Sequence, residues 1–230
     1  MLAVWRVAPG SKGDVRISPF FSIQAARRVQ KHLSSKIIKR DVLPPFIRTI
    51  AGVDLAYKES LAIGVAVLLE YQGLNIIGKS VSVTKITFPY VPTLLSFREL
   101  KPAYLALTHL PSEPDIVMVD AHGYSHPFRL GFASHLGVVM QKPTIGVAKK
   151  ILCGTIGEWR DDWAPILDKG EIIGAAVVTR HGAKPVYVSI GNMISLETAI
   201  KITMHTAKGY RIPEPTRLAH LECKRIVREL

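Results

Sequence analysis

The chain has 230 residues, of which 48% are hydrophobic and 21% are charged. This balance supplies a sizeable buried core and argues against a disordered chain. The formal net charge is +12, from 30 Lys and Arg against 18 Asp and Glu. Such an excess favours a polyanionic partner, nucleic acid above all. A merely basic protein fits the charge equally well, because net charge reports on partners and solubility and not on fold.

The two cysteines, Cys153 and Cys223, are too few for a disulfide scaffold and lack the spacing of a zinc site. We therefore expect a reducing, cytoplasmic location. The first residues are too polar for a secretory signal. Charged residues interrupt every apolar stretch well before the roughly 18 residues that a membrane span needs. The sequence thus predicts no membrane association, and we expect a monomer.

A basic N-terminal extension comes first in the chain. Residues 22–40 carry apolar side chains at helical spacing, with Arg and Lys on the other faces. We predict a basic helix here, within an extension over residues 1–48 that packs on a single domain spanning residues 1–230. The basic side chains of this helix either face solvent or contact phosphates.

Three segments rich in Val, Ile and Leu follow, at residues 49–57, 62–70 and 74–86. Their close spacing predicts an antiparallel meander. The pattern then becomes helical between about Thr93 and Leu110. Pro102 lies inside this segment, and we expect it to begin a new helical turn because proline is tolerated there and not within a helix.

Strands and helices alternate in the rest of the chain. The predicted strands span residues 114–123, 143–150, 171–180 and 184–192, the last two as a hairpin, and the predicted helices span residues 129–140, 195–207 and 215–230. Ser195 and Thr216 are the expected N-caps of the last two helices. We therefore predict an α/β fold with a mixed sheet, formed by an antiparallel meander of three strands plus parallel strands and flanked by helices. This is the ribonuclease H-like arrangement.

Two aspartates each follow a strand-like apolar run, Asp54 in IAGVDLAY and Asp120 in IVMVDAHG. A buried acid costs free energy unless it is hydrogen-bonded, paired or metal-bound. Capping of the following loop explains either acid alone. Glu99 is a third acid, on the same helical face as Leu95, although a surface position is the alternative for it. Three converging carboxylates would repel one another, so together they predict a divalent cation, Mg²⁺ or Mn²⁺.

Two basic residues could complete such a site. Lys149 ends a predicted strand at the edge that Asp120 would share if the two strands are parallel neighbours, where it could neutralise a phosphate. His220 shares a helical stripe with Cys223 and Val227 and could orient or deprotonate a water. A solvated lysine and a buried core histidine are the alternative interpretations.

A tight loop follows Asp120 at the end of its predicted strand. It contains His122 and His126, with Gly123 and Pro127 beside them. Functional sites are often built on loops at strand ends. We expect His126 either to bind substrate or to brace the loop.

Taken together, these motifs resemble the endonuclease V (deoxyinosine 3′ endonuclease) family. The matching stretches are IAGVDLAY, FPYVPTLLSFRE, KPAYLAL, IVMVDAHGYSHPFRLGFASHLGV, PTIGVAKKILCG and RLAHLECKR. The resemblance extends from about Ile50 to the end of the sequence. It is specific, because the Pro-Tyr-(Ile or Val)-Pro segment and the D-x-H/Q-G-x-x-H-P-x-R-x-G loop rarely occur together elsewhere.

The resemblance implies a ribonuclease H-like fold and a DNA repair activity that depends on Mg²⁺, with Mn²⁺ as a substitute. Such an enzyme nicks damaged DNA at the second phosphodiester bond 3′ to a deoxyinosine and leaves 3′-hydroxyl and 5′-phosphate ends. By motif, the metal ligands are Asp54, Glu99 and Asp120, and the further catalytic residues are Lys149 and His220. The segment Pro89, Tyr90, Val91 and Pro92 corresponds to a wedge that holds the strands apart while the base is turned out. The expected lesion and DNA contacts are this wedge together with Thr93, Leu95, Ala121, His122, Gly123 and His126.

Two positions depart from the family pattern. Thr93 and Ala121 stand where the family usually has glycine, and a side chain at each is expected to narrow the lesion pocket. The expected consequence is altered lesion selectivity or weaker recognition. Inosine in RNA is an alternative substrate, because the resemblance includes relatives that prefer it. A catalytically silent nucleic-acid-binding protein is a second alternative, which the three acids disfavour. A junction-resolving nuclease is a third, which the Pro-Tyr-Val-Pro wedge disfavours.

Overall fold

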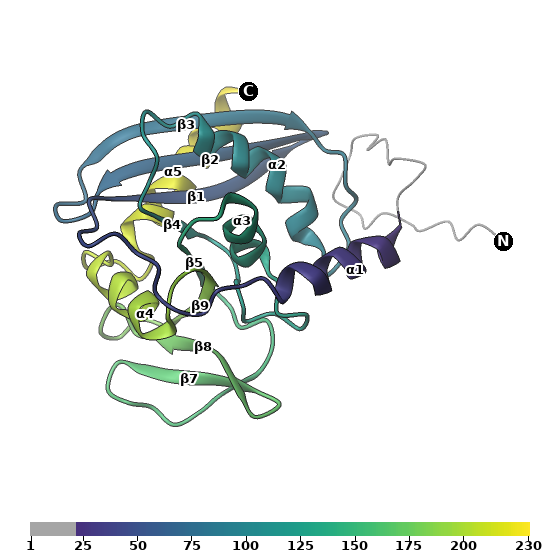
Figure 1. The fold of residues 1–230 in the computed structure, drawn as a ribbon. Coiled ribbons are helices and arrows are strands. Elements are labelled where there is room, and N and C mark those ends of the chain that lie inside the picture. The colour runs from purple at the N-terminus through teal and green to yellow at the C-terminus, as the bar shows by residue number, and fades with distance from the viewer. Residues whose placement is uncertain (1–21) are drawn as a thin grey trace.

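The computed structural model describes residues 22–230 (Figure 1). Its nine strands are β1 (Thr49–Lys58), β2 (Leu61–Glu70), β3 (Ile76–Lys85), β4 (Ile116–Val119), β5 (Thr144–Ala148), β6 (Thr155–Ile156), β7 (Trp163–Asp168), β8 (Glu171–Val177) and β9 (Val186–Asn192). Its helices are α1 (Ile23–Ser34), α2 (Leu95–Thr108), α3 (Phe132–Met140), α4 (Leu196–His205) and α5 (Glu214–Glu229). Residues 1–21 of the predicted extension lie outside the described residues, so the single domain over residues 1–230 stays a prediction. Within residues 22–230, no helix combines the length and apolar character needed to cross a membrane.

All nine strands belong to one sheet, in the order β3-β2-β1-β4-β5-β9-β8-β7-β6. The first three strands are antiparallel neighbours, β4 is parallel to β1, and β5 is parallel to β4. This confirms the predicted mixed, ribonuclease H-like sheet. The predicted hairpin is confirmed as β8 and β9, which pair antiparallel. The sequence did not predict β6 and β7, which extend the sheet beyond β8.

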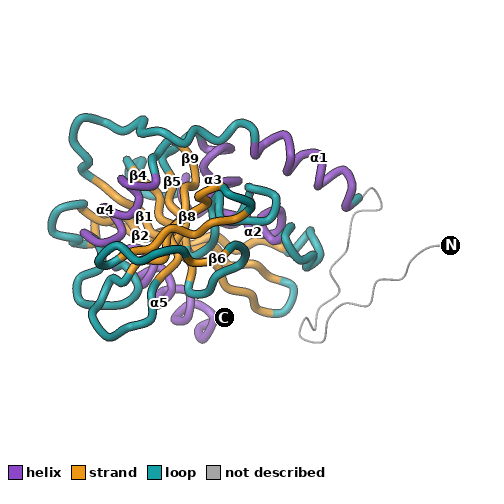
Figure 2. The backbone as a smooth tube through the Cα atoms, turned by 90° about the horizontal axis from the view of Figure 1, so that it is seen from below, coloured by secondary structure: helices purple, strands orange, loops and turns teal. Residues whose placement is uncertain are grey.

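Helices cover both faces of the sheet and enclose a separate core on each. Helices α4 and α5 pack on one face, over alternate strand residues such as Ile50 and Met118. Helices α2 and α3 pack on the other, over the intervening residues such as Val53 and Val119. The alternation follows from the two-residue period of a strand. Helix α1 lies on the opposite side of the molecule from α4 in both views (Figures 1 and 2).

The start of α5 lies directly against β1. A Cβ atom added at Gly52 would lie 1.8 Å from the carbonyl oxygen of Pro215, a separation that no pair of non-bonded atoms tolerates. Glycine at this position therefore permits the close approach of α5. That approach brings the first turns of α5 next to the middle of β1.

The expected role of Pro102 is wrong, because α2 continues through this residue. Proline cannot donate the helical hydrogen bond, and packing on the sheet offsets that loss. The Pro102 carbonyl accepts a hydrogen bond of 2.6 Å from the Ser82 hydroxyl. A Cβ atom at Gly64 would lie 2.4 Å from the same carbonyl oxygen. The proline is thus held by tertiary contacts that a helical pattern does not reveal.

Two other helix ends differ from the prediction. Helix α1 ends at Ser34 and not at Arg40, because the Ile38 backbone instead bonds to Asn192 and Met193 at the end of β9. Helix α5 is capped by Pro213 and not by Thr216, whose hydroxyl donates to the Pro213 carbonyl. The predicted N-cap of α4 is confirmed, since the Ser195 side chain accepts a hydrogen bond from the Thr198 amide.

Candidate active site

The two strand-end aspartates become neighbours through the register of β1 and β4. Val53 pairs with Val119 in this parallel pair. Asp54 directly follows Val53, and Asp120 directly follows Val119. The Asp120 amide donates to the Val53 carbonyl at 3.1 Å. Both carboxylates continue the alternation that faces α5. The fold therefore sets two largely buried acids side by side at the point where β4 ends.

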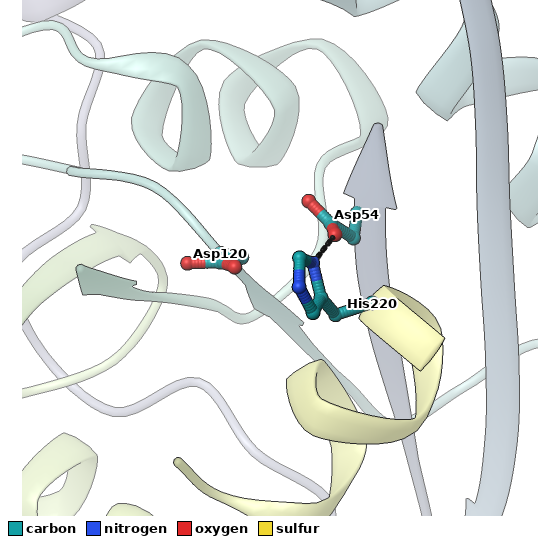
Figure 3. Close-up of side chains that lie close together, drawn as sticks. All are labelled: Asp54, Asp120 and His220. Carbon is teal, nitrogen blue, oxygen red and sulfur yellow. Dashed lines mark hydrogen bonds and ion pairs between the residues drawn. The ribbon is translucent and has the colours of Figure 1, made fainter. Parts of the chain in front are cut away.

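His220 of α5 points at this pair of acids (Figure 3). Its Nδ1 lies 2.7 Å from Asp54 Oδ2, and a carboxylate only accepts, so this nitrogen donates the hydrogen bond. One ligand atom from each of Asp54, Asp120 and His220 lies within 4.8 Å of the others. This group of two carboxylates and an imidazole could hold a metal ion.

Glu99 approaches from the opposite helix layer. It lies on α2, is only 9% exposed, and accepts a hydrogen bond of 3.2 Å from the Tyr57 hydroxyl. Glu99 is not one of the three residues grouped within 4.8 Å. Its pKa is raised to about 8, mainly by burial; the Tyr57 hydrogen bond opposes this shift, and the charges of Asp54 and Asp120 add to it.

The electrostatics of these acids fit a divalent cation. Burial, and then the charge of Asp120, hold the pKa of Asp54 above its ordinary range, against the hydrogen bond from His220. The pKa of Glu99 is shifted in the same direction, so the positive charges nearby do not fully offset the cost of ionising these two acids. A divalent cation such as Mg²⁺ or Mn²⁺, which prefers hard oxygen ligands, would offset it.

Among the described residues, Lys149 forms an ion pair with Asp120, in which its Nζ contacts Asp120 Oδ2 directly. It follows β5, whose parallel pairing with β4 places the two strand ends together. The geometry expected from the sequence, a lysine beside Asp120 at one sheet edge, is therefore what the structure shows.

A cavity of about 500 Å³ opens beside these residues. It is lined by Tyr90, Thr93, Leu95, Ser96, Glu99, Asp120, Ala121, His122, His126, Leu130, Gly131, Phe132, Ala148, Lys149, Lys150 and Leu152. Six of the expected lesion-binding residues are among them. Pro89, Val91, Pro92 and Gly123 are not among the lining residues.

The Pro-Tyr-Val-Pro segment presents its aromatic side chain to the outside. Tyr90 is 60% exposed, lines the cavity and lies in the loop that leads into α2. Thr93 follows with a φ of 66°, in the left-handed region that glycine adopts freely and β-branched residues rarely do. The structure thus gives a physical reason why glycine would be favoured at this position.

The loop after Asp120 closes another side of the cavity. His126 is buried, and its Nδ1 accepts a hydrogen bond of 3.2 Å from the Phe128 amide, so it braces the loop. Burial lowers its pKa to about 4, so the ring is neutral at pH 7. His122 contacts the Lys150 carbonyl through Nε2 at 2.9 Å, and burial lowers its pKa as well. Both histidines line the cavity without adding charge to it.

Sequence reasoning missed several cavity residues. They are Ser96, Leu130, Gly131, Phe132, Ala148, Lys150 and Leu152. Ser96 had a usable signal, because it lies between the expected contact Leu95 and the acid Glu99. Residues 130–132 had no such signal, since their position depends on the path of the loop that joins β4 to α3.

Comparison with known proteins agrees with this fold. Residues 31–221 match the family model of endonuclease V. Endonuclease V from Thermofilum pendens is 51% identical over 207 residues, which cover 90% of this chain and 89% of the relative. The structure of endonuclease V from Streptomyces avermitilis has a TM-score of 0.86 and 37% identity, covering 94% of this chain and 98% of that one.

A nucleic-acid complex is also among the similar structures. Endonuclease V from Ciona intestinalis, bound to a 24mer DNA containing an inosine followed by a ribo-adenosine, has a TM-score of 0.80 and 28% identity. The matched region covers 90% of this chain and 98% of the Ciona intestinalis chain. The fold and the buried acid pair define the class of protein, a nuclease with a ribonuclease H-like sheet. The chain belongs to the endonuclease V family.

The raised pKa of Glu99 predicts a pH-dependent stability for the metal-free protein. The folded-state pKa of about 8 lies above the ordinary 4.5. The contribution of Glu99 to the free energy of unfolding is therefore complete below pH 4.5 and is lost as pH rises through 8. Glu99→Gln, which stays neutral, should therefore melt about 5 °C above the wild type at pH 9. The two should converge at pH 5. Thermal unfolding in EDTA measures this, with exposed Glu158→Gln as control; parallel curves for wild type and Glu99→Gln would contradict the assignment.

Proposed function

We propose that this chain is a DNA repair endonuclease that hydrolyses the second phosphodiester bond 3′ to a deoxyinosine and leaves 3′-hydroxyl and 5′-phosphate ends. The observation that carries the proposal is the partly buried group of Asp54, Asp120 and His220, of which Asp120 lines a cavity of about 500 Å³. Family membership and the inosine-containing DNA bound by the Ciona intestinalis relative support it. The net charge of +12 suits a nucleic-acid substrate.

The proposed cofactor is Mg²⁺, with Mn²⁺ as a substitute. Asp54 and Asp120 would hold it from β1 and β4, and Glu99 would reach it from α2 as the third carboxylate. A bound divalent cation supplies charge stabilisation at the phosphate and makes a water acidic enough to act as nucleophile. The support from this chain is electrostatic, because burial and mutual repulsion raise the pKa of both Glu99 and Asp54.

The two basic side chains would divide the remaining tasks. With Nδ1 of His220 donating to Asp54, Nε2 is left as the acceptor nitrogen and can take a proton from the attacking water. Lys149 pairs with Asp120. When substrate binds, its ammonium group would also stabilise the negative charge of the phosphate. Both residues would therefore act directly on the reacting groups.

The wedge and the cavity would handle the damaged base. Inosine pairs weakly, so turning it out of the stack costs less than for a normal base. Exposed Tyr90 would fill the gap in the duplex, while Pro89, Val91 and Pro92 limit its freedom. The cavity would receive the base, with backbone N–H groups after Pro92 and Asp120 donating to its carbonyl.

Inosine in RNA is the second candidate substrate. The ligand of the Ciona intestinalis relative has a ribonucleotide directly after the inosine, so a member of this family accommodates a 2′-hydroxyl beside the lesion.

The free cysteines Cys153 and Cys223 support a reducing, cytoplasmic location. The monomeric state stays a prediction.

Nicking of labelled duplexes tests the reaction itself. With Mg²⁺ the wild type should cut DNA containing one inosine at the second bond on its 3′ side, and undamaged DNA far less. Asp120→Asn should lower the rate by at least about 1,000-fold, since a central catalytic group is lost, and should still bind the duplex. Exposed Asp161→Asn is the matched control. Equal cutting of undamaged DNA, or no cutting of inosine in DNA or RNA, would refute the proposal.

Removal of the wedge aromatic tests lesion recognition separately. Tyr90→Ala should weaken binding to inosine DNA about 10-fold, because a stacking side chain contributes on the order of 1–3 kcal/mol. Binding is measured by fluorescence anisotropy in EDTA, which prevents cutting. Tyr104→Ala removes another exposed tyrosine, on α2 and away from the cavity, and should bind normally. Unchanged binding and nicking by Tyr90→Ala would show that it is not a wedge.

A further inference from the structure

Thr93 occupies a backbone conformation that its side chain disfavours. Its φ is 66°, and a β-branched residue is held in the left-handed region only when the surrounding structure imposes it. Thr93 also lines the cavity, directly after the wedge. Whatever holds Thr93 therefore also positions the wedge and this wall of the cavity.

Arg27 of α1 makes the contacts that hold Thr93. Its Nη2 donates to Thr93 Oγ1 at 2.5 Å and to the Pro92 carbonyl at 3.3 Å. Its Nη1 donates to the Thr93 carbonyl at 3.4 Å. The Thr93 hydroxyl in turn donates to the Pro92 carbonyl at 2.5 Å. The guanidinium also lies 4.0 Å from the centre of the Phe128 ring, so the arginine is fixed on its other side by the loop after Asp120.

Gln30, one turn further along α1, connects two walls of the cavity. Its side-chain amide is fully buried, at 0% exposure. Nε2 donates to the Thr93 carbonyl at 2.9 Å and to the Leu130 carbonyl at 3.1 Å, and Oε1 accepts from Arg27 at 2.7 Å. Thr93 and Leu130 both line the cavity, from the wedge loop and from the loop after Asp120. One amide thus uses both N–H groups to join the two loops.

We propose that Arg27 and Gln30 form a brace that sets the separation of these two cavity walls and thereby the enzyme's selectivity for inosine. The brace positions residues and does not touch the reacting atoms, and this inference rests on the proposed function. Both residues precede the segment 31–221 that matches the family model. In this chain the Thr93 hydroxyl accepts a hydrogen bond from Arg27 that glycine at this position could not accept.

Loss of the brace should affect recognition more than chemistry. Replacing Gln30 by leucine removes the donor that the Thr93 and Leu130 carbonyls share and leaves Thr93 only the longer bond from Arg27, while Asp54 and Asp120 stay fixed by β1 and β4. Each lost hydrogen bond should change kcat/KM by about 5-fold. Gln30→Leu and Arg27→Ala should therefore lower the ratio of kcat/KM for inosine to undamaged DNA by about 10-fold, mainly through KM.

Matched variants lie on the exposed face of the same helix. Gln24→Leu and Arg28→Ala make the same chemical changes at exposed positions and should keep the selectivity of the wild type. Arg27→Lys retains one donor for the Thr93 hydroxyl and should recover part of the ratio. In a Thr93→Gly background, Arg27→Ala should have a smaller effect, because glycine adopts the left-handed conformation without support.

Two measurements decide the proposal. Hydrogen exchange followed by mass spectrometry should show faster exchange over residues 90–94 and 124–131 in Gln30→Leu and not in Gln24→Leu. Exchange equal to that of the wild type in both loops would show that there is no brace, whatever the activity. Single-turnover nicking at temperatures where all variants are folded then gives the selectivity ratio. If wild type cuts inosine DNA and the brace variants keep its ratio, the inference fails while the proposed function stands; if wild type does not cut, the proposed function fails.

Discussion

The site depends on two carboxylates that the fold brings together where little water reaches them. The parallel register of β1 and β4 places Asp54 and Asp120 at adjacent positions. Burial and the neighbouring charge raise the pKa of Asp54, which measures how strongly this arrangement disfavours ionisation. Lys149 and His220 each contact one of the two carboxylates, and Glu99 adds a further buried acid. The surrounding protein therefore holds together a negative site that a divalent cation would complete.

The helix layers on the two faces of the sheet bring different groups to these acids. Gly52 allows α5 to approach β1 closely enough for His220 to reach Asp54. On the other face, α2 is fixed to β2 and β3 around Pro102 and carries Glu99 to the end of the sheet. The proposed wedge, residues 89–92, comes shortly before α2, so one element positions both the Tyr90 side chain and Glu99. Helix α1 then joins the start of that element to the loop after Asp120.

Local patterns predicted the parts of this site that depend on strand order. Apolar runs gave β1, β4 and β5, and their parallel order was enough to place Asp120 beside Lys149. Contacts between distant segments were not predictable in the same way. The path of α2 through Pro102 depends on Ser82 and Gly64, and the end of α1 depends on Asn192. Helical spacing indicated that Glu99 faces the sheet but not that it arrives from the layer opposite His220. The unusual Thr93 was visible in the sequence, whereas its partners Arg27 and Gln30 were not, because 63 or more positions separate them.

Cation binding by the acid pair is the central claim, and electron paramagnetic resonance of Mn²⁺ tests it most directly. Mn²⁺ is titrated into the protein without DNA, and the signal of the free ion is followed for the wild type, Asp54→Asn, Asp120→Asn and the exposed control Asp161→Asn. We expect the wild type and Asp161→Asn to remove Mn²⁺ from solution with the same affinity, and each of the other two variants to bind it at least about 10-fold more weakly, as loss of a ligand requires. Equal Mn²⁺ binding by all four proteins would contradict a metal site at Asp54 and Asp120.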